Sequence, residues 1–418
     1  MEVFQNILIV VSILLEIMVL GFLELKMWKT VYTPLNFLML PYLAVLLITL
    51  MLAGSEWGFV DFYYPSVLIW NVSLLIFAIP SLTLGFLSNK SGKCIEPKCL
   101  DISKDSIPKI LVVFSVILSL LFLWHLKGML GNPSLAIGSE DFGEEFSGGG
   151  LWGHLRQLTI PLLIMCIYSV SKQRWWLWPI IFVFLIVGLL NQVKSWVIIP
   201  VLAAVFMRLY TKKMKLTLRL LFFVVFGAML VFFLSYALSI LVVNDRGVSE
   251  SFMELVFSGF FHYLTSGTLG WSVDLENSLP DASWGSFENI IAQVVNFIRS
   301  LTGSGELVYP INPLFYNTGI TLTNVRTIFG TLYINSNLIE YVLYILFLST
   351  SMYLIKIAMT RYNNIYCYTI YFFYCALLFM GWFDFFFSGL IIYEFPIITI
   401  AMYYVSSLVP VKNNIEKI

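Results

Sequence analysis

Long apolar stretches recur from one end of the chain to the other, with short polar segments between them. A helix needs about 20 apolar residues to cross the hydrocarbon core of a bilayer. About eleven stretches approach that length: Phe4–Phe22, Leu35–Leu52, Ser66–Phe86, Ile110–Leu126, Leu151–Ser169, Trp175–Leu190, Trp196–Leu209, Leu218–Val243, Leu338–Ile357, Tyr366–Phe387 and Leu390–Leu408. The pattern predicts an all-α, polytopic integral membrane helical bundle, with residues 1–418 forming a single transmembrane domain.

The composition supports a membrane protein. Of the 418 residues, 59% are hydrophobic and only 11% are charged, whereas soluble domains carry about 25% charged residues. The first apolar stretch lacks the basic n-region and small-residue cleavage site of a signal peptide, so we expect it to be a permanent helix. The formal net charge is zero and gives no reason to expect a nucleic-acid partner.

The basic residues set the expected orientation. In membrane proteins the short cytoplasmic loops carry an excess of Lys and Arg. With the N-terminus outside, all but six of the 24 basic residues fall on the inner face. The six on the outer face are Lys127, Arg156, Lys194, Arg246, Arg299 and Arg326. We therefore expect a periplasmic N-terminus, a cytoplasmic C-terminus and a functional role for some of these scarce outer cations.

The longest break in the apolar pattern covers residues 244–337. Aromatic residues recur throughout it, and Glu288–Ile298 has the apolar spacing of an amphipathic helix. The sequence thus predicts a large periplasmic loop that folds back on the membrane surface and caps the outer face. A second outer loop, Gly128–Gly150, is acidic and rich in glycine.

The outer cations are candidates for an anion site. Guanidinium groups bind phosphate bidentately, and lysine supplies a point charge. Four cations are candidates for a phosphate group: Lys194, Arg246, Arg326 and Arg156. The alternative is that they snorkel or form salt bridges, because the loop also carries Glu250, Glu254, Asp274, Glu276 and Glu288. Arg299 follows the amphipathic stretch and looks like the polar edge of a surface helix.

Other polar residues suggest further chemistry. His262 lies among aromatic residues in FFHYL and is a candidate general base, because imidazole titrates near physiological pH; packing is the alternative. Glu16 lies within the first apolar stretch and would need a partner or a proton. Asp384 and Glu394 flank the last outer turn and are expected to hold loop cations in place. The sequence carries no phosphate-binding glycine loop, zinc signature or nucleophile elbow.

Three local stretches resemble a known family. NQVKSWVIIPVLAAV, FFHYLTSGTLGW and TNVRTIFGTLY are similar to segments of the Wzy-type O-antigen and oligosaccharide repeat-unit polymerases, and the order of most spans matches as well. The chain departs from that family at Lys194, where the family usually has arginine, and in lacking the spaced Arg-to-Gly pattern of some members. Lysine at this position loses bidentate phosphate geometry.

The resemblance implies a GT-C-like glycosyltransferase of the bacterial inner membrane that joins undecaprenyl-pyrophosphate-linked repeat units. It implies that Lys194, Arg246, Arg326 and Arg156 bind pyrophosphate and that His262 accepts a proton. Four aromatic residues would bind the glycan: Tyr263, Trp271, Trp284 and Tyr316. The alternative role of the last three is anchoring at the membrane interface. The expected partners are the lipid-linked oligosaccharides, membrane lipids and a chain-length regulator protein, with no metal or cofactor. The alternatives are an O-antigen ligase and a lipid-linked oligosaccharide flippase or secondary transporter.

Overall fold

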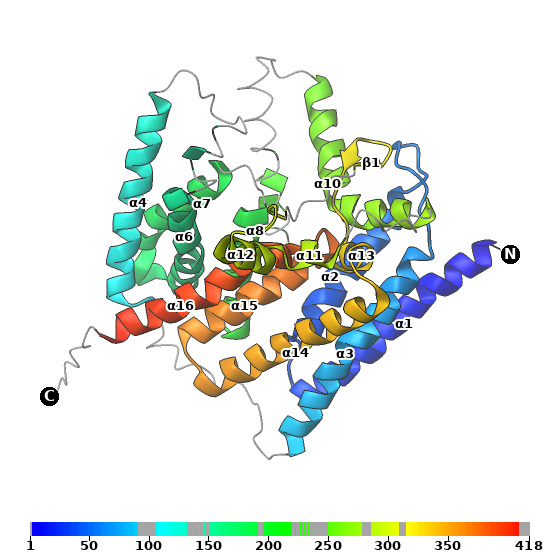
Figure 1. Ribbon diagram of the computed structural model, residues 1–418, viewed down its shortest axis with the longest axis horizontal. Coiled ribbons are helices and arrows are strands. Elements are labelled where there is room, and N and C mark those ends of the chain that lie inside the picture. The colour runs from blue at the N-terminus through cyan, green and yellow to red at the C-terminus, as the bar shows by residue number, and fades with distance from the viewer. Residues whose placement is uncertain are drawn as a thin grey trace. The chain divides into compact units, whose positions relative to one another are not determined.

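The computed structural model describes residues 2–90, 106–131, 150–190, 195–219, 250–277, 286–308 and 315–408, with a few single residues between them. Over these ranges the protein is almost entirely helical (Figure 1). One short antiparallel hairpin joins β1 (Tyr316–Asn317) and β2 (Leu322–Thr323) and pairs Tyr316 with Thr323. The predicted all-α helical bundle is therefore confirmed.

The part of the chain that the structure describes holds eight helices that are long and apolar enough to cross a membrane. They are α1 (Glu2–Trp28), α2 (Pro34–Leu52), α3 (Ser66–Lys90), α4 (Lys109–Leu130), α6 (Gly150–Ser169), η2 (Lys172–Leu177) with α7 (Trp178–Leu190), α14 (Leu338–Tyr362), and α15 (Ile365–Phe379) with η5 (Met380–Trp382). Two shorter apolar helices are α8 (Ser195–Tyr210) and α16 (Ile391–Ser407). The chain is thus a multi-pass membrane protein. Most of the predicted stretch Leu218–Val243 lies outside the described residues.

The chain forms two compact units, and the first combines residues 1–98, 249–362 and 374–392. Within it α1 and α14 both pack against α3. A buried polar group lies between these helices: Glu24 accepts hydrogen bonds from Ser81 and from the Tyr353 hydroxyl, 3.0 Å away. Lys356 is also buried and donates to the Tyr32 carbonyl at 2.9 Å. These bonds satisfy an acid and a base that would otherwise be costly inside a membrane.

The sequence pointed to a different acid in the first span. Glu16 is only partly buried, and its Oε1 has no hydrogen-bond partner among the described residues. Glu24, near the C-terminal end of α1, is fully buried. Hydropathy alone does not distinguish them, because the polar partners of Glu24 come from α3 and α14.

The second unit combines residues 99–248, 363–373 and 393–418. Its helix α6 packs against α7 and α8, and α4 packs against α6 and α7. Arg208, in the last turn of α8, donates to the carbonyls of Ile167, Tyr168 and Val170 at 2.8, 3.2 and 3.0 Å. These carbonyls lie at the C-terminal end of α6 and lack helical partners, so Arg208 caps α6.

The segment 244–337 was predicted as a large loop, but most of its described residues are helical. It contains α10 (Glu250–Glu276), α11 (Phe287–Ile290), α12 (Ala292–Thr302) and α13 (Ile328–Ile334), with the hairpin between α12 and α13. The predicted helix over Glu288–Ile298 is confirmed, with a break at Ile291 where the backbone leaves helical angles. The 27-residue helix α10 was not predicted.

Candidate functional site

One face of α10 carries the polar side chains from which the candidate site is built. His262, Ser266, Gly270 and Asp274 are spaced four residues apart, which places them along one side of the helix. The β1–β2 hairpin lies against this side. The Thr318 hydroxyl is 2.9 Å from His262 Nδ1, and the Tyr316 hydroxyl donates to Asp274 Oδ2 at 2.6 Å.

Glycine allows the neighbouring backbone to approach α10 closely. A Cβ at Gly267 would overlap the carbonyl oxygens of Trp382 and Phe383, and a Cβ at Gly270 would lie 2.8 Å from the Val325 carbonyl oxygen. Gly267 is the glycine of the Tyr-Leu-x-x-Gly segment that resembles the polymerase family. The glycines therefore let the end of η5 with the following turn, and the segment before Arg326, reach α10.

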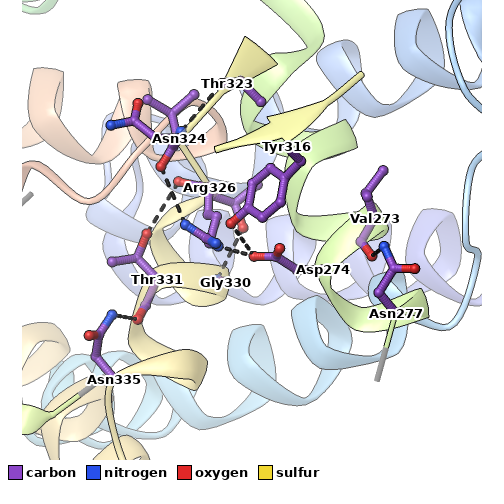
Figure 2. Close-up of polar contacts among 12 residues, drawn as sticks. Val273, Asp274, Asn277, Tyr316, Thr323, Asn324, Arg326, Gly330, Thr331 and Asn335 are labelled. Atoms are coloured by element: carbon purple, nitrogen blue, oxygen red, sulfur yellow. Dashed lines mark hydrogen bonds and ion pairs between the residues drawn. The ribbon is translucent and has the colours of Figure 1, made fainter. Parts of the chain in front are cut away.

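Arg326 is the centre of the site (Figure 2). Its Nε donates to Asp274 Oδ2, its Nη1 donates to the Asn324 carbonyl at 3.3 Å, and its Cζ lies 4.4 Å above the centre of the Tyr316 ring. The side chains of Arg326 and Asp274 are only 2% and 1% exposed. Their charges are therefore held away from water and depend on each other.

A second carboxylate, Asp384, approaches the same arginine from the turn after η5. Its Oδ1 accepts hydrogen bonds from the Phe385 amide at 2.8 Å and from the Thr331 hydroxyl at 3.4 Å, and the Arg326 backbone also donates to the carboxylate. Asp384 remains partly exposed, unlike Asp274. That Asp384 holds a loop cation in place stays a prediction, because the salt bridge of Arg326 is made with Asp274 and Asp384 accepts from the Arg326 backbone. Glu394 instead contacts His154 at 3.2 Å.

Burial changes the proton affinity of both carboxylates. It raises the pKa of Asp274 to about 7 and that of Asp384 to about 6, and Arg326 offsets only part of each rise. Burial also lowers the pKa of Arg326, but a guanidinium stays protonated in proteins. The site therefore combines a fixed positive charge with two carboxylates that titrate near neutral pH.

His262 is buried against the β1–β2 hairpin. Burial lowers the pKa of His262 to about 4, so its imidazole is neutral at physiological pH. The Thr318 hydroxyl donates its hydrogen to the Thr321 carbonyl at 2.9 Å, so it accepts from the Nδ1–H of His262. This tautomer leaves the lone pair on Nε2.

The other predicted residues are distributed more widely. The Tyr263 ring lies 4.3 Å from that of Phe383, next to Asp384. Trp271 is buried, donates to the Ser66 carbonyl at 3.3 Å and packs against Gly330, so its ring faces protein. Arg156 is half-buried in α6, within the second unit. Lys194, Arg246 and Trp284 lie outside the described residues.

Two of the predicted outer cations form salt bridges with acidic residues of the same segment. Salt bridges were the alternative to phosphate binding in the sequence analysis. Arg326 pairs with Asp274, and Arg299 pairs with Glu288 at 2.8 Å. The sequence alone does not identify the partner of either arginine. The four-residue spacing of polar positions from His262 to Asp274 was the available signal, and recognising it required α10 to be identified as a helix.

Fold and site define a multi-pass membrane protein with a buried, ion-paired arginine outside its candidate spans. The chain belongs to the family of unknown function DUF6337, whose model matches residues 58–411. This match includes α10, the hairpin, Arg326 and Asp384. No curated protein and no solved structure matches the chain.

Proposed function

We propose that the chain is a surface-polysaccharide polymerase of the O-antigen type, a glycosyltransferase that joins undecaprenyl-pyrophosphate-linked repeat units at the periplasmic face of the bacterial inner membrane. The observation that carries the proposal is the Arg326 site. Asp384, which is partly exposed as a residue although its carboxyl group is shielded enough to raise its pKa, lies beside a buried guanidinium in the turn between two membrane helices. This arrangement suits proton transfer during group transfer to a hydroxyl.

The proposed reaction has one bond-forming and one bond-breaking event. A hydroxyl oxygen of the acceptor glycan attacks the anomeric carbon of the donor glycan. The bond from that carbon to the pyrophosphate oxygen breaks, and undecaprenyl pyrophosphate leaves with the electron pair. The hydroxyl proton passes to a protein base. Negative charge grows on the leaving pyrophosphate, where positioned cations lower the barrier.

Asp384 is the base that the geometry favours. A pKa of about 6 leaves this carboxylate ionised at neutral pH yet close enough to accept a proton effectively. His262 is the residue that the sequence suggested, and its Nε2 carries a lone pair. However, it is buried and its pKa is about 4, so it is the weaker base.

The cations divide into two roles in this proposal. Arg326 is nearly inaccessible and paired with Asp274, so we assign it to holding Asp384 in place. Pyrophosphate binding by Lys194, Arg246 and Arg156 stays as the resemblance implies it. Of these, Arg156 lies on a described helix, α6, where its side chain is half-buried. Tyr263 and Tyr316 are the aromatic residues beside the site that remain candidates for contact with sugar.

The decisive experiment follows the surface glycan of a strain that lacks this gene. A polymerase predicts a single repeat unit on lipid A core, whereas a ligase predicts no attached glycan and accumulated lipid-linked polymer. The wild-type gene should restore long chains, and Asp384→Asn should not at matched protein levels. Normal chain lengths with Asp384→Asn would place the chemistry elsewhere.

The alternative that the protein is a transporter is tested in detergent, where no membrane separates two compartments. The purified protein in detergent should lengthen lipid-linked repeat units, because a glycosyltransferase needs no gradient. A flippase would leave their length unchanged. Reporters fused near Ser283 and near Lys98 test the orientation, and we expect the first to be periplasmic and the second cytoplasmic.

A further inference from the structure

Helix α12 presents an apolar stripe that the described part of the protein leaves uncovered. Val294, Phe297, Ile298 and Leu301 are all exposed, with Phe297 65% and Leu301 72% accessible. Their positions at i, i+3, i+4 and i+7 place them on one face of the helix. Large exposed apolar side chains that share one face mark a contact surface.

The polar side of α12 forms hydrogen bonds with the chain segment that follows the helix. The Asn296 side chain donates to the Val308 carbonyl at 2.8 Å and accepts from the Val308 amide at 2.7 Å. Arg299 donates to the Glu306 carbonyl at 2.6 Å and to Glu288 at 2.8 Å. The turn between helix and return segment is made by Gly303, which has the left-handed angle φ 65°. Residues 288–308 therefore hold the helix so that its apolar stripe faces outward.

Contacts of α11 fix the level of this segment relative to the membrane helices. The Phe287 ring lies 6.0 Å from that of Tyr344, the seventh residue of α14. Six steps of about 1.5 Å place Tyr344 about 9 Å along this helix from its first residue. Asn289 also donates to Asn335, just before α14, at 3.1 Å, and α11 packs against η6 (Phe386–Ser388). The segment is thus anchored next to the start of α14 and to the turn before α16.

We infer that α12 is an in-plane interfacial helix whose stripe inserts between the lipids of the leaflet at the N-terminal end of α14. The stripe contacts lipid at the boundary between the headgroups and the acyl chains of the bilayer. An amphipathic helix lying in the interface buries its apolar face about 5–10 Å below the headgroups. The Phe287–Tyr344 contact brings the segment to that depth, where lipid is the surrounding medium. The inference is independent of the proposed reaction.

Spin labels test this contact in the full-length protein. The five native cysteines are replaced, and Phe297→Cys, Leu301→Cys and Ser300→Cys are labelled separately. Each protein is reconstituted in vesicles of phosphatidylethanolamine and phosphatidylglycerol. Labels at 297 and 301 should collide more with oxygen, which concentrates in the bilayer, than with a water-soluble nickel complex. The label at 300 is the matched control, because Ser300 is exposed beside the stripe, and it should show the reverse.

Three outcomes would overturn the inference. Equal, high nickel accessibility at all three positions would place the stripe in water. Low accessibility to both reagents at 297 and 301 would indicate a covering protein. As a second measurement that keeps the native cysteines, a photoreactive benzophenone amino acid at position 297 should attach to lipid, and attachment to protein alone would contradict the inference.

Discussion

Arg326 and Asp274 form an ion pair across 52 positions of sequence, in surroundings where each side chain is at most 2% exposed. The Tyr316 hydroxyl shares the same carboxylate oxygen, whereas Asp274 Oδ1 has no partner among the described residues. The pair joins the end of α10 to the segment before α13. It is therefore both a packing element and the support of the Asp384 turn.

Breaking this pair from one side should be costly. Asp274→Leu leaves a buried guanidinium without its carboxylate, and removing one partner of a buried pair costs about 3–5 kcal/mol. The double variant Asp274→Leu with Arg326→Met should recover most of the loss. Thermal unfolding in detergent measures both. Glu288→Gln is the control, because its pair with Arg299 is solvent-accessible and worth about 0–1 kcal/mol. Equal losses in the single and double variants would contradict a coupled pair.

The pH dependence of chain elongation should identify the base. A base must be deprotonated to act, so the rate rises with pH through the pKa of that group. Asp384 predicts a rise centred near pH 6, and His262 predicts one near pH 4. Initial rates of polymer formation by the purified protein measure the profile. His262→Gln should leave the midpoint unchanged, and a midpoint near 4 would assign the base to His262.

The free energy of unfolding should fall as the pH rises from about 4 to about 7. The folded pKa of Asp274 and of Asp384 is raised above the ordinary aspartate value, so the folded protein binds these protons more tightly than the unfolded chain. The resulting stabilisation is complete below the unfolded pKa of about 3.9 and is lost as pH rises toward 7. Unfolding temperature against pH measures it. Asp384→Asn should flatten the part of the curve near pH 6, and an unchanged slope would rule out this assignment.

The close approach at Gly267 predicts a steric effect. Gly267→Ala places a methyl group against the Trp382 and Phe383 carbonyl oxygens, so the turn carrying Asp384 must move. Overpacking of this kind costs about 1–3 kcal/mol. Gly128→Ala is a matched helical control with nothing within 4 Å of the added atom, and it should be neutral or slightly stabilising. Similar unfolding temperatures and activities for both variants would show that the turn adapts freely.

The membrane helices could be predicted because hydropathy is local. The predicted stretches Leu35–Leu52 and Leu151–Ser169 match α2 and α6 within one residue at each end. The first stretch was predicted to end at Phe22, yet α1 continues to Trp28. Its last turns contain Glu24 and Lys26, which interrupt the apolar pattern, while hydrogen bonds to Ser81 and Tyr353 keep Glu24 inside the bundle.

The site was only partly predictable, because its geometry depends on distant contacts. The sequence singled out Arg326 and His262 by residue type, and Asp384 by its place in the last turn predicted for the outer face. The partner of Arg326 was not identified, because Asp274 was one of several acidic residues in a segment taken as a loop. Trp271 shows the same limit. Its residue type suits sugar stacking, but Ser66 and Gly330 enclose it in the core.

The position of Asp384 in the chain has a consequence for biosynthesis. Asp274 and Arg326 precede α14, whereas Asp384 follows α15 and η5. Because membrane segments emerge from the ribosome in order, the ion pair can form while the Asp384 turn is still untranslated. The catalytic half of the proposed site is thus added last to a preassembled support. A nascent chain arrested after α14 would carry all six cations that the sequence predicts for the outer face, and we expect it to be inactive.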